Sequence, residues 1–429
     1  MLKLMRHCRL VVIVLIAINV VSAQQPPPDG VYELASNGGT ITIAPFGTGM
    51  AAFFSDGRVR GLRQNDASSW VIGKSVGNVS EAAGFISLSG DEIRVNFEGD
   101  ATLEGSRLKL SKQKALFKNG RQQLAGELIL PEGNGPFPAV VLTHGSGEET
   151  RDQSLGMAYL FAANGIAALI YDKRGCGESS GKEWRAPFKD YANDLLAGVR
   201  YLTTLSTIDP ERIGLYGHSQ GGWVVPLAYS LQSERIAFCI ISAANAVSPV
   251  DQTLMAGDQE LMLRGEDAAT IREVHDFRRI KYAVGITGKD KKRYLSTALP
   301  DAQRKPWFKL TGGALPNDKF WKANGFYDPA PALKALGCPV LVLFAEFDVS
   351  TDTKSQLPLM KQLLSGDVEY RLIPNANHMM MKVSDKGFTK TQLQTIDRFA
   401  DGYLETLIAW TRGKTGLQFR NYARAATTG

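Results

Sequence analysis

The sequence predicts an α/β protein: a mostly parallel sheet covered on both faces by helices, preceded by a small all-β domain. After residue 113, apolar stretches without polar alternation are separated by segments with helical spacing, which is typical of parallel strands buried on both faces. Before residue 112, short alternating stretches such as Thr40-Ile41-Thr42-Ile43 are punctuated by glycine and asparagine, with no long helical period. This first region therefore predicts a sandwich or a partial barrel.

The first residues of the chain predict export. Residues 1–23 combine a basic start, an apolar stretch and the small-residue sequence Val21-Ser22-Ala23, which is the pattern of a cleaved signal peptide. The apolar stretch is shorter than the roughly 20 residues that span a bilayer, so cleavage is favoured over an uncleaved anchor helix. We expect a periplasmic or secreted protein with no stable membrane anchor.

Charge and cysteine content narrow the class of partner. Removal of residues 1–23 takes three of the basic residues and lowers the formal net charge from +6 to +3, which is too small to indicate a nucleic-acid partner. The three remaining cysteines are Cys176, Cys239 and Cys338. Their spacing predicts neither a disulfide framework nor a metal site. The sequence leaves the oligomeric state open.

Beyond the signal peptide, composition and spacing divide the chain into a β domain, a core, a cap and a tail. Residues 24–112 form the small β domain, and residues 113–246 with 329–413 form the core of alternating strands and helices. Residues 247–328 interrupt the core as a helical cap insertion, and residues 414–429 are a C-terminal tail with no assigned role. A long insertion at the edge where strands end is typical of a cap over a binding site.

The elements of the core follow in a regular order. A hairpin turning at Asn119-Gly120 comes first, and strands then alternate with helices. We expect strands over 138–145, 167–173, 212–217, 236–242, 339–346 and 368–374, and helices over 157–164, 190–205, 220–231, 351–364 and 391–410. Ligands bind such sheets at the carboxyl ends of the strands.

One strand end carries a candidate nucleophile. The stretch Gly217-His218-Ser219-Gln220-Gly221 lies between a predicted strand and a predicted helix, the setting of a Gly-x-Ser-x-Gly elbow that exposes its serine. A serine hydroxyl needs a histidine base oriented by an acid. The base is assigned to His378, in the loop after the last strand, rather than to His275 in the cap.

The acid and the oxyanion donors come from two further strand ends. Asp348 is the predicted acid, with Glu346 as runner-up, whereas Asp352 is expected to begin a helix. An oxyanion hole needs two backbone N–H groups, which we assign to Gln220 and Ser146. Gly145 and Gly147 are alternatives to Ser146, and His144 is expected to hold this loop in place.

Trp223 follows the elbow and is a candidate substrate-binding residue, with helix packing as an equal alternative. No cofactor and no metal are expected. The glycine-rich stretch 171–183 does not have phosphate-loop spacing, because five residues separate Gly175 from Gly181 and Glu183 follows Lys182.

The motifs "HGSG", "YDKRGCGESSG", "GHSQGG", "FAEFD" and "NANH" occur in the order found in the α/β-hydrolase superfamily, which the stretch 139–378 resembles. The chain is most similar to bacterial exported serine esterases with a small N-terminal β domain, near the serine aminopeptidase and dienelactone hydrolase groups. The resemblance implies that Asp172, Arg174, Gly177 and Ser179 hold the loop beside the elbow.

The predicted function is hydrolysis of carboxylic esters of small to medium acyl substrates through an acyl-enzyme, with a small-molecule ester as the binding partner. Two alternatives remain open. One is a serine aminopeptidase or another amide or thioester hydrolase, since the same residues serve these reactions. The other is a binding protein whose hydrolase domain is inactive.

Overall fold

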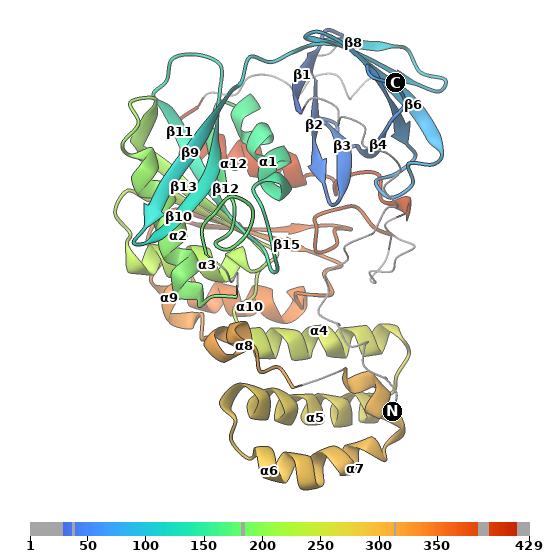
Figure 1. Cartoon of the computed structure of the whole chain (residues 1–429), viewed down its shortest axis with the longest axis vertical. Helices are drawn as coiled ribbons and strands as arrows, with labels where there is room; N and C mark the ends of the chain where they lie inside the picture. Colours follow the sequence, from blue (N-terminus) through green and yellow to red (C-terminus); the bar gives the residue numbers. More distant parts are fainter. Residues whose placement is uncertain (1–28, 37–38, 182–184, 313–314, 385–393, 418–429) are drawn as a thin grey trace.

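The structure, a computed structural model, describes residues 29–36, 39–181, 185–312, 315–384 and 394–417. Along the longest axis, the barrel and the α/β core lie side by side toward one end and the cap lies at the other end (Figure 1). Residues 1–23, where the signal peptide is predicted, and most of the tail 414–429 fall outside the described residues. In the described part of the chain, no helix has both the length and the apolar character needed to span a bilayer.

The N-terminal unit is a closed antiparallel barrel of eight strands. The strands pair in sequence order and the last pairs with the first, so that no sheet edge is left open. Apolar side chains such as Ile43, Trp70 and Ile86 fill the interior. The strands are β1 (Gly30–Leu34), β2 (Thr40–Phe46), β3 (Gly49–Phe54), β4 (Val59–Gln64), β5 (Ser69–Gly73), β6 (Ala82–Ser89), β7 (Glu92–Phe97) and β8 (Leu103–Arg107).

The core is an eight-stranded sheet in the order β16-β15-β14-β13-β11-β12-β10-β9. The β9–β10 and β10–β12 pairs are antiparallel and the remaining pairs are parallel. The predicted mostly parallel sheet is therefore confirmed. Its strands are β9 (Ser111–Asn119), β10 (Gln122–Leu130), β11 (Phe137–Thr143), β12 (Ala167–Tyr171), β13 (Ile208–His218), β14 (Phe238–Ser242), β15 (Val340–Ala345) and β16 (Val368–Ile373).

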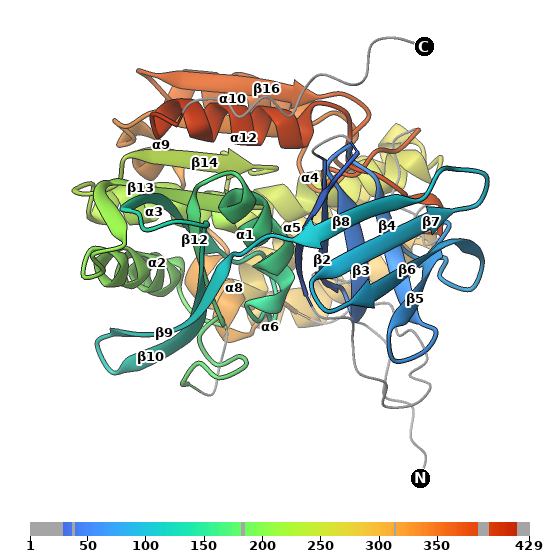
Figure 2. The same ribbon diagram turned by 90° about the horizontal axis from the view of Figure 1, so that it is seen from above.

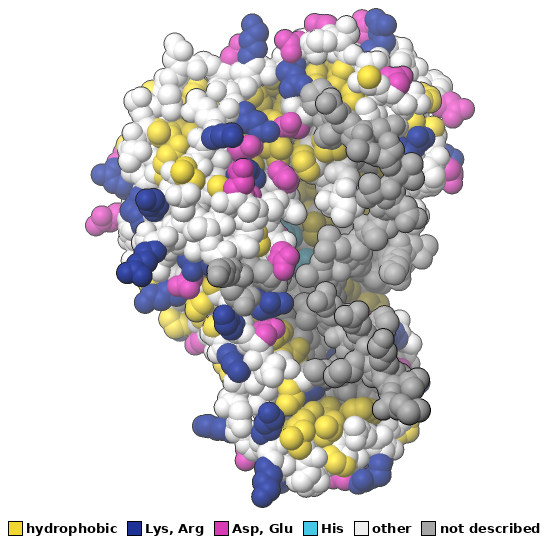
Figure 3. Space-filling view, viewed as in Figure 1, with side chains coloured by type: hydrophobic (Ala, Val, Ile, Leu, Met, Phe, Trp, Pro, Cys, Tyr) yellow, Lys and Arg dark blue, Asp and Glu magenta, His cyan; other side chains and the backbone are white. Residues whose placement is uncertain are grey.

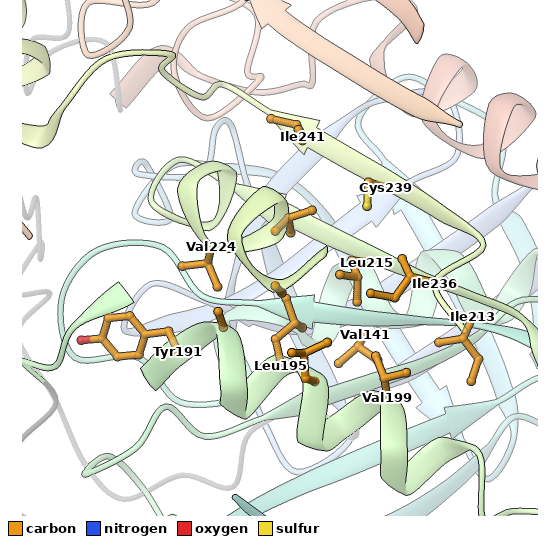
Figure 4. Packing of buried hydrophobic residues seen from close by; sticks show 14 of the residues in the cluster. Val141, Tyr191, Leu195, Val199, Ile213, Leu215, Val224, Ile236, Cys239 and Ile241 are labelled. Atoms are coloured by element: carbon orange, nitrogen blue, oxygen red, sulfur yellow. The ribbon is translucent and has the colours of Figure 1, made fainter. Parts of the chain in front are cut away.

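Helices cover both faces of this sheet (Figure 2). One face packs against α2 (Phe188–Leu202), α3 (Gly221–Leu231) and α10 (Thr353–Leu363), and the other against α1 (Asp152–Ala163) and α12 (Tyr403–Lys414). On the first face, Leu195 and Val199 of α2 point toward Val141 and Leu215 of the sheet (Figure 4). Truncating one such buried leucine to alanine costs about 2–5 kcal/mol. The packing of the helices on the sheet therefore fixes the carboxyl ends of the strands.

The cap lies between β14 and β15 and is helical, as predicted. Its aromatic residues pack mainly against one another, with Phe277 contacting Trp307 and Phe308, and Trp321 contacting Tyr282. The elements are α4 (Pro249–Leu263), α5 (Ala268–Thr287), α6 (Lys291–Arg293), η1 (Tyr294–Ala298), α7 (Leu299–Gln303), η2 (Pro306–Thr311) and α8 (Lys319–Asn324), with α9 (Ala330–Lys334) leading back to the core.

The last helix differs from the expected range 391–410. Residues 391–393 are outside the described part, and α12 begins only at Tyr403. Residues 396–400 instead form main-chain hydrogen bonds with the barrel and with the loop after β16. Tertiary hydrogen bonding therefore overrides the local helical spacing of this segment, a competition that propensity alone does not reveal.

Candidate active site

Ser219 lies on a sharp turn between β13 and α3. Its φ of 55° is in the left-handed region, a strained conformation for a residue with a side chain. Neighbouring glycines make the turn possible, because a Cβ at Gly217 would lie 2.3 Å from the Gly221 carbonyl oxygen and one at Gly222 would lie 2.0 Å from the Ala244 Cβ. The Ser219 N–H donates to the Ser242 carbonyl on the neighbouring strand at 2.9 Å, which holds the turn against the sheet.

The structure brings Ser219, His378 and Asp348 together in one hydrogen-bonded chain. His378 Nε2 is 2.9 Å from Ser219 Oγ, and His378 Nδ1 is 2.8 Å from Asp348 Oδ2. The other carboxylate oxygen, Asp348 Oδ1, accepts the N–H groups of Ser350 and Thr351, both at 2.8 Å. The Asp348 side chain is fully buried and its orientation is fixed from both sides.

The alternative acids and the alternative base occupy other positions. Glu346 is exposed and accepts the Asn375 N–H at 2.9 Å, and Asp352 is the N-cap residue of α10. His275 lies between two cap helices, where Nδ1 is 2.7 Å from Asp258 Oδ2.

His378 and His218, the two histidines near Ser219, differ in the direction in which their pKa is shifted. Burial lowers the pKa of His378, but the charge and hydrogen bond of Asp348 outweigh it and raise the pKa above its ordinary value. The ring of His218 lies 5.2 Å from that of His378. Burial and the neighbouring His378 lower the pKa of His218 to about 3, so His218 stays neutral and does not oppose a positive charge on His378.

The two backbone N–H groups assigned to the oxyanion hole have no hydrogen-bond partner among the described residues. No hydrogen bond within the described residues engages the N–H of Gln220, the N-cap of α3, or that of Ser146. The Gly145 N–H, an alternative donor, already donates to Glu149 Oε2 at 2.8 Å. A helix N-terminus and an unengaged loop N–H together suit a negatively charged oxygen.

A buried lysine holds the loop that carries Ser146. Lys173 Nζ donates to the carbonyl oxygens of Gly145 at 2.8 Å and Gly147 at 2.9 Å. Burial lowers the pKa of Lys173 to about 8, although the carboxylate of Glu149 acts in the opposite direction. Burial also raises the pKa of Glu149. The carbonyls on both sides of Ser146 are therefore fixed by one side chain.

His144 also helps to hold the loop that carries Ser146 in place, as expected. Its Nε2 pairs with the Tyr171 carbonyl oxygen. Burial and the charge of Lys173 lower the pKa of His144 to about 3, so it remains neutral at working pH.

The stretch after β12 forms a braced turn. Asp172 accepts the N–H groups of Arg151 and Glu178, both at 2.8 Å, and Ser179 Oγ donates to the Asp172 carbonyl. Arg174 forms hydrogen bonds with Asp194 on α2. These contacts give the turn the structural role that the family resemblance implies.

Trp223 is buried in the core and its indole N–H donates to the Val247 carbonyl oxygen at 3.0 Å. Its ring stacks on Phe188 of α2 with the centroids 5.4 Å apart. A cavity of about 320 Å³ lies nearby at the base of the cap; its lining includes Val247, Ser248 and Phe326. The described contacts of Trp223 are thus packing contacts, and its role in substrate binding stays a prediction.

Figure 3 shows histidine surface in a hollow on one face of the molecule. Among the residues that the structure describes, no group of three or more His, Cys, Asp or Glu side chains could hold a metal ion.

Two residues at the site were not predicted from the sequence. Lys173 is a charged residue at the end of the predicted strand 167–173, and this position is the signal that could have found it. Asn377 precedes His378, and its side-chain oxygen accepts the N–H groups of Met379 and Met381 at 3.0 and 3.1 Å. It shapes the loop that presents the histidine.

Comparison with known proteins agrees with this architecture. Residues 140–387 match the model of the alpha/beta hydrolase family. Esterase EstD of Thermotoga maritima is 27% identical over 283 residues, which cover 64% of this chain and 61% of that esterase. Thiohydrolase AneE of Aspergillus aculeatus is 38% identical over 102 residues, covering 23% of this chain and 31% of that enzyme.

A solved structure, DcsB in complex with its substrate analogue, has a TM-score of 0.48 and 16% identity, covering 71% of this chain and 99% of that one. The family match extends over more than half of the chain and includes all three residues of the Ser219–His378–Asp348 chain. Together with its esterase and hydrolase relatives, it shows that the chain belongs to the alpha/beta hydrolase family.

Proposed function

We propose that this protein is a serine hydrolase that cleaves carboxylic esters of small to medium acyl substrates through an acyl-enzyme. The observation that carries the proposal is the position of His378, within hydrogen-bonding distance of both Ser219 Oγ and Asp348 Oδ2. This arrangement of nucleophile, base and orienting acid is what serine-based acyl transfer requires. The esterase among its relatives supports the same class of substrate.

The proposed reaction proceeds in two halves. Ser219 Oγ attacks the ester carbonyl carbon while His378 Nε2 takes the hydroxyl proton, and the N–H groups of Gln220 and Ser146 bind the resulting oxyanion. His378 then gives the proton to the departing alkoxide. The alcohol leaves, and the acyl-enzyme remains. His378 then takes a proton from water, whose oxygen attacks the acyl carbon. His378 returns this proton to Ser219 Oγ as the bond between Oγ and the acyl carbon breaks and the carboxylic acid leaves. Asp348 holds the ring and stabilises its charged form throughout.

Thioester hydrolysis is the second candidate, because a thiohydrolase is similar to the chain over 102 residues and the same residues would perform it. A panel of substrates separates the two. It comprises p-nitrophenyl esters from acetate to palmitate, an aminoacyl anilide and an acyl thioester, each tested with the wild type and with Ser219→Ala.

Ester turnover that disappears in Ser219→Ala while the circular dichroism spectrum is unchanged is the expected result. Turnover of the anilide alone would move the protein to the peptidases. An undiminished rate in Ser219→Ala would refute the assignment of the nucleophile. Failure of the wild type to react with a fluorophosphonate probe would favour an inactive binding protein.

Export is also a proposal, and it rests on the pattern of residues 1–23. N-terminal sequencing of the protein from a bacterial host tests it. Cleavage after Ala23, with the product in the periplasm or the medium, is expected. An intact N-terminus in the cytoplasmic fraction would contradict it.

A further inference from the structure

Residues 394–400, which precede α12, form hydrogen bonds with the barrel. The N–H of Val59 on β4 donates to the Asp397 carbonyl at 2.6 Å, and the N–H of Val76 donates to the Ile396 carbonyl at 2.8 Å. Residues 394–400 therefore continue the hydrogen bonding of the barrel's outer surface, although more than 300 residues separate the two in the sequence.

The same segment is bonded on its other side to the loop that carries His378. The Lys382 N–H donates to the Arg398 carbonyl at 3.0 Å, and the Ala400 N–H donates to the Met380 carbonyl at 2.9 Å. Residues 394–400 thus lie between the barrel and the residues directly after the histidine.

His378 is at the tip of a tight hairpin. The Asn377 N–H donates to the Met381 carbonyl at 3.0 Å, and the Val383 N–H donates to the Asn375 carbonyl at 2.8 Å. Met380, next but one to the histidine, is fully buried and has a φ of 57°. Displacement of residues 380–382 would therefore displace His378 as well.

An apolar cluster covers the same contact. Ala51 and Val59 of the barrel pack with Met381, Val383 and Ile396. Phe347, which directly precedes Asp348, packs against this cluster, and its N–H donates to the Ala376 carbonyl at 2.7 Å. The outer face of the barrel consequently supports both the acid loop and the histidine hairpin.

Two polar side chains of the barrel complete the contact. The Arg60 guanidinium donates to the Asp397 carbonyl and pairs with the Asp397 carboxylate at 3.2 Å, and its side chain is 13% exposed. Ser75 is buried and its hydroxyl donates to the Gln394 carbonyl at 2.6 Å. Neither side chain contributes to the apolar interior of the barrel.

We propose that the N-terminal barrel positions the catalytic histidine. Arg60 and Ser75 hold residues 394–400, and these residues hold the hairpin at the place where His378 reaches both Ser219 and Asp348. Arg60 and Ser75 are positioning residues, because neither contacts the reacting groups. The inference rests on the proposed function in that His378 is taken as the general base.

The expected loss of kcat follows from the sensitivity of catalytic rate to the position of the reacting groups. A misplacement of about 1 Å can lower the rate about 100-fold. Arg60→Met keeps the length of the side chain and removes the donors that hold residue 397, so a smaller displacement is expected. We expect kcat to fall about 10-fold, with KM changed by less than about twofold.

The experiment compares Arg60→Met and Ser75→Ala with two control variants in the full-length chain. Arg94→Met removes an exposed ion pair to Glu104 between β7 and β8, and Val95→Ala weakens the barrel interior without touching residues 394–400. The rate is expressed per active site from the p-nitrophenol burst, so a reduced folded fraction does not count as reduced kcat.

Arg60→Met and Ser75→Ala should lower kcat per site, and Arg60→Lys should recover part of the loss. Val95→Ala should lower the melting temperature while kcat per site stays within about twofold of wild type. An equal loss of kcat per site in Val95→Ala would mean a general effect of stability and would overturn the proposal. If Arg60→Met does not fold, Ser75→Ala and Arg60→Lys decide by the same criterion.

Hydrogen–deuterium exchange provides a readout that does not depend on activity. Arg60→Met should accelerate exchange of the amides in residues 379–383, and Arg94→Met should not. Wild-type exchange in this hairpin together with a wild-type kcat would overturn the proposal. Accelerated exchange in a protein that hydrolyses none of the substrates would instead refute the proposed function and leave the coupling of barrel and hairpin intact.

Discussion

Replacing Lys173 by methionine tests whether the Lys173 side chain holds the loop that carries Ser146, a predicted oxyanion donor. The substitution removes the two hydrogen bonds to the carbonyls of Gly145 and Gly147 and keeps an unbranched side chain of similar length. It also leaves the buried Glu149 without its neighbouring cation. We expect the loop to loosen and the Ser146 N–H to lose its fixed direction.

The stability change is a difference between two opposing terms. Two hydrogen bonds from a charged donor contribute about 1.5–3 kcal/mol each. Lowering the pKa of Lys173 from 10.5 to about 8 corresponds to an unfavourable burial of the charged form of about 3 kcal/mol, and methionine relieves it. The net loss in free energy of unfolding at pH 7 should therefore be about 0–3 kcal/mol.

The catalytic change should be larger than the stability change. Loss of one oxyanion donor lowers kcat about 100- to 1000-fold, and a loosened donor should approach the lower figure. The assay is kcat per burst-titrated site on p-nitrophenyl acetate, with urea unfolding in parallel. Lys74→Met, which removes an exposed ion pair to Glu81 on the barrel, is the control and should change neither quantity appreciably.

The pH dependence gives an independent check with a defined sign. Between pH 8 and 10.5 the unfolded chain retains the Lys173 proton that the folded chain has lost, so this group makes the wild type more stable as pH rises. Below pH 8 both states hold the proton and the contribution is constant. Lys173→Met should lack this rise. A variant with wild-type kcat per site, or with the same pH slope as wild type, would refute the assigned role of Lys173.

Four further predictions concern the site and its surroundings. Asp348→Asn should lower kcat about 10⁴-fold, whereas Glu346→Gln, the matched change at an exposed position, should leave kcat near the wild-type value. If only Glu346→Gln lowered kcat, Glu346 and not Asp348 would be the acid that orients His378. The acid limb of the kcat/KM profile should lie above pH 6.5, because Asp348 raises the pKa of His378 and the base must be neutral, and it should move to lower pH in Asp348→Asn. Trp223→Phe should lower the melting temperature with KM unchanged, since the indole N–H is bonded to Val247; a raised KM at wild-type stability would support substrate contact instead. Thiol titration of the folded protein after removal of residues 1–23 should find Cys176 reactive, and Cys239 and Cys338 protected until denaturation, because both are buried; fast reaction of all three would contradict the buried contact between the latter pair.

The core and the chain of three residues could be predicted because local signals coincide with tertiary structure there. Apolar strands without alternation, glycines around Ser219 and the order of strand ends all point to the same edge of the sheet. Asp348 could be chosen over Glu346 because it lies further beyond the end of its strand, where the site is expected.

The contacts between distant segments could not be predicted in the same way. The segment 396–400 has helical spacing in the sequence, but its main-chain groups are bonded to the barrel and to the histidine hairpin. The position of Lys173 at the end of a predicted strand marks it as unusual, but its role becomes clear only when the carbonyls of Gly145 and Gly147 are placed beside it. The barrel closes because β1 pairs with β8, and the paired residues are about 75 positions apart in the sequence. The alternation of apolar and polar residues within each strand does not predict this pairing.

The most direct test of the central claim is to identify the acylated residue during turnover. The protein is mixed with p-nitrophenyl acetate, quenched in acid within the burst phase and digested for mass spectrometry. We predict one acetyl group on Ser219, absent in Ser219→Ala. An acetyl group on another residue, or steady turnover in Ser219→Ala, would contradict the account.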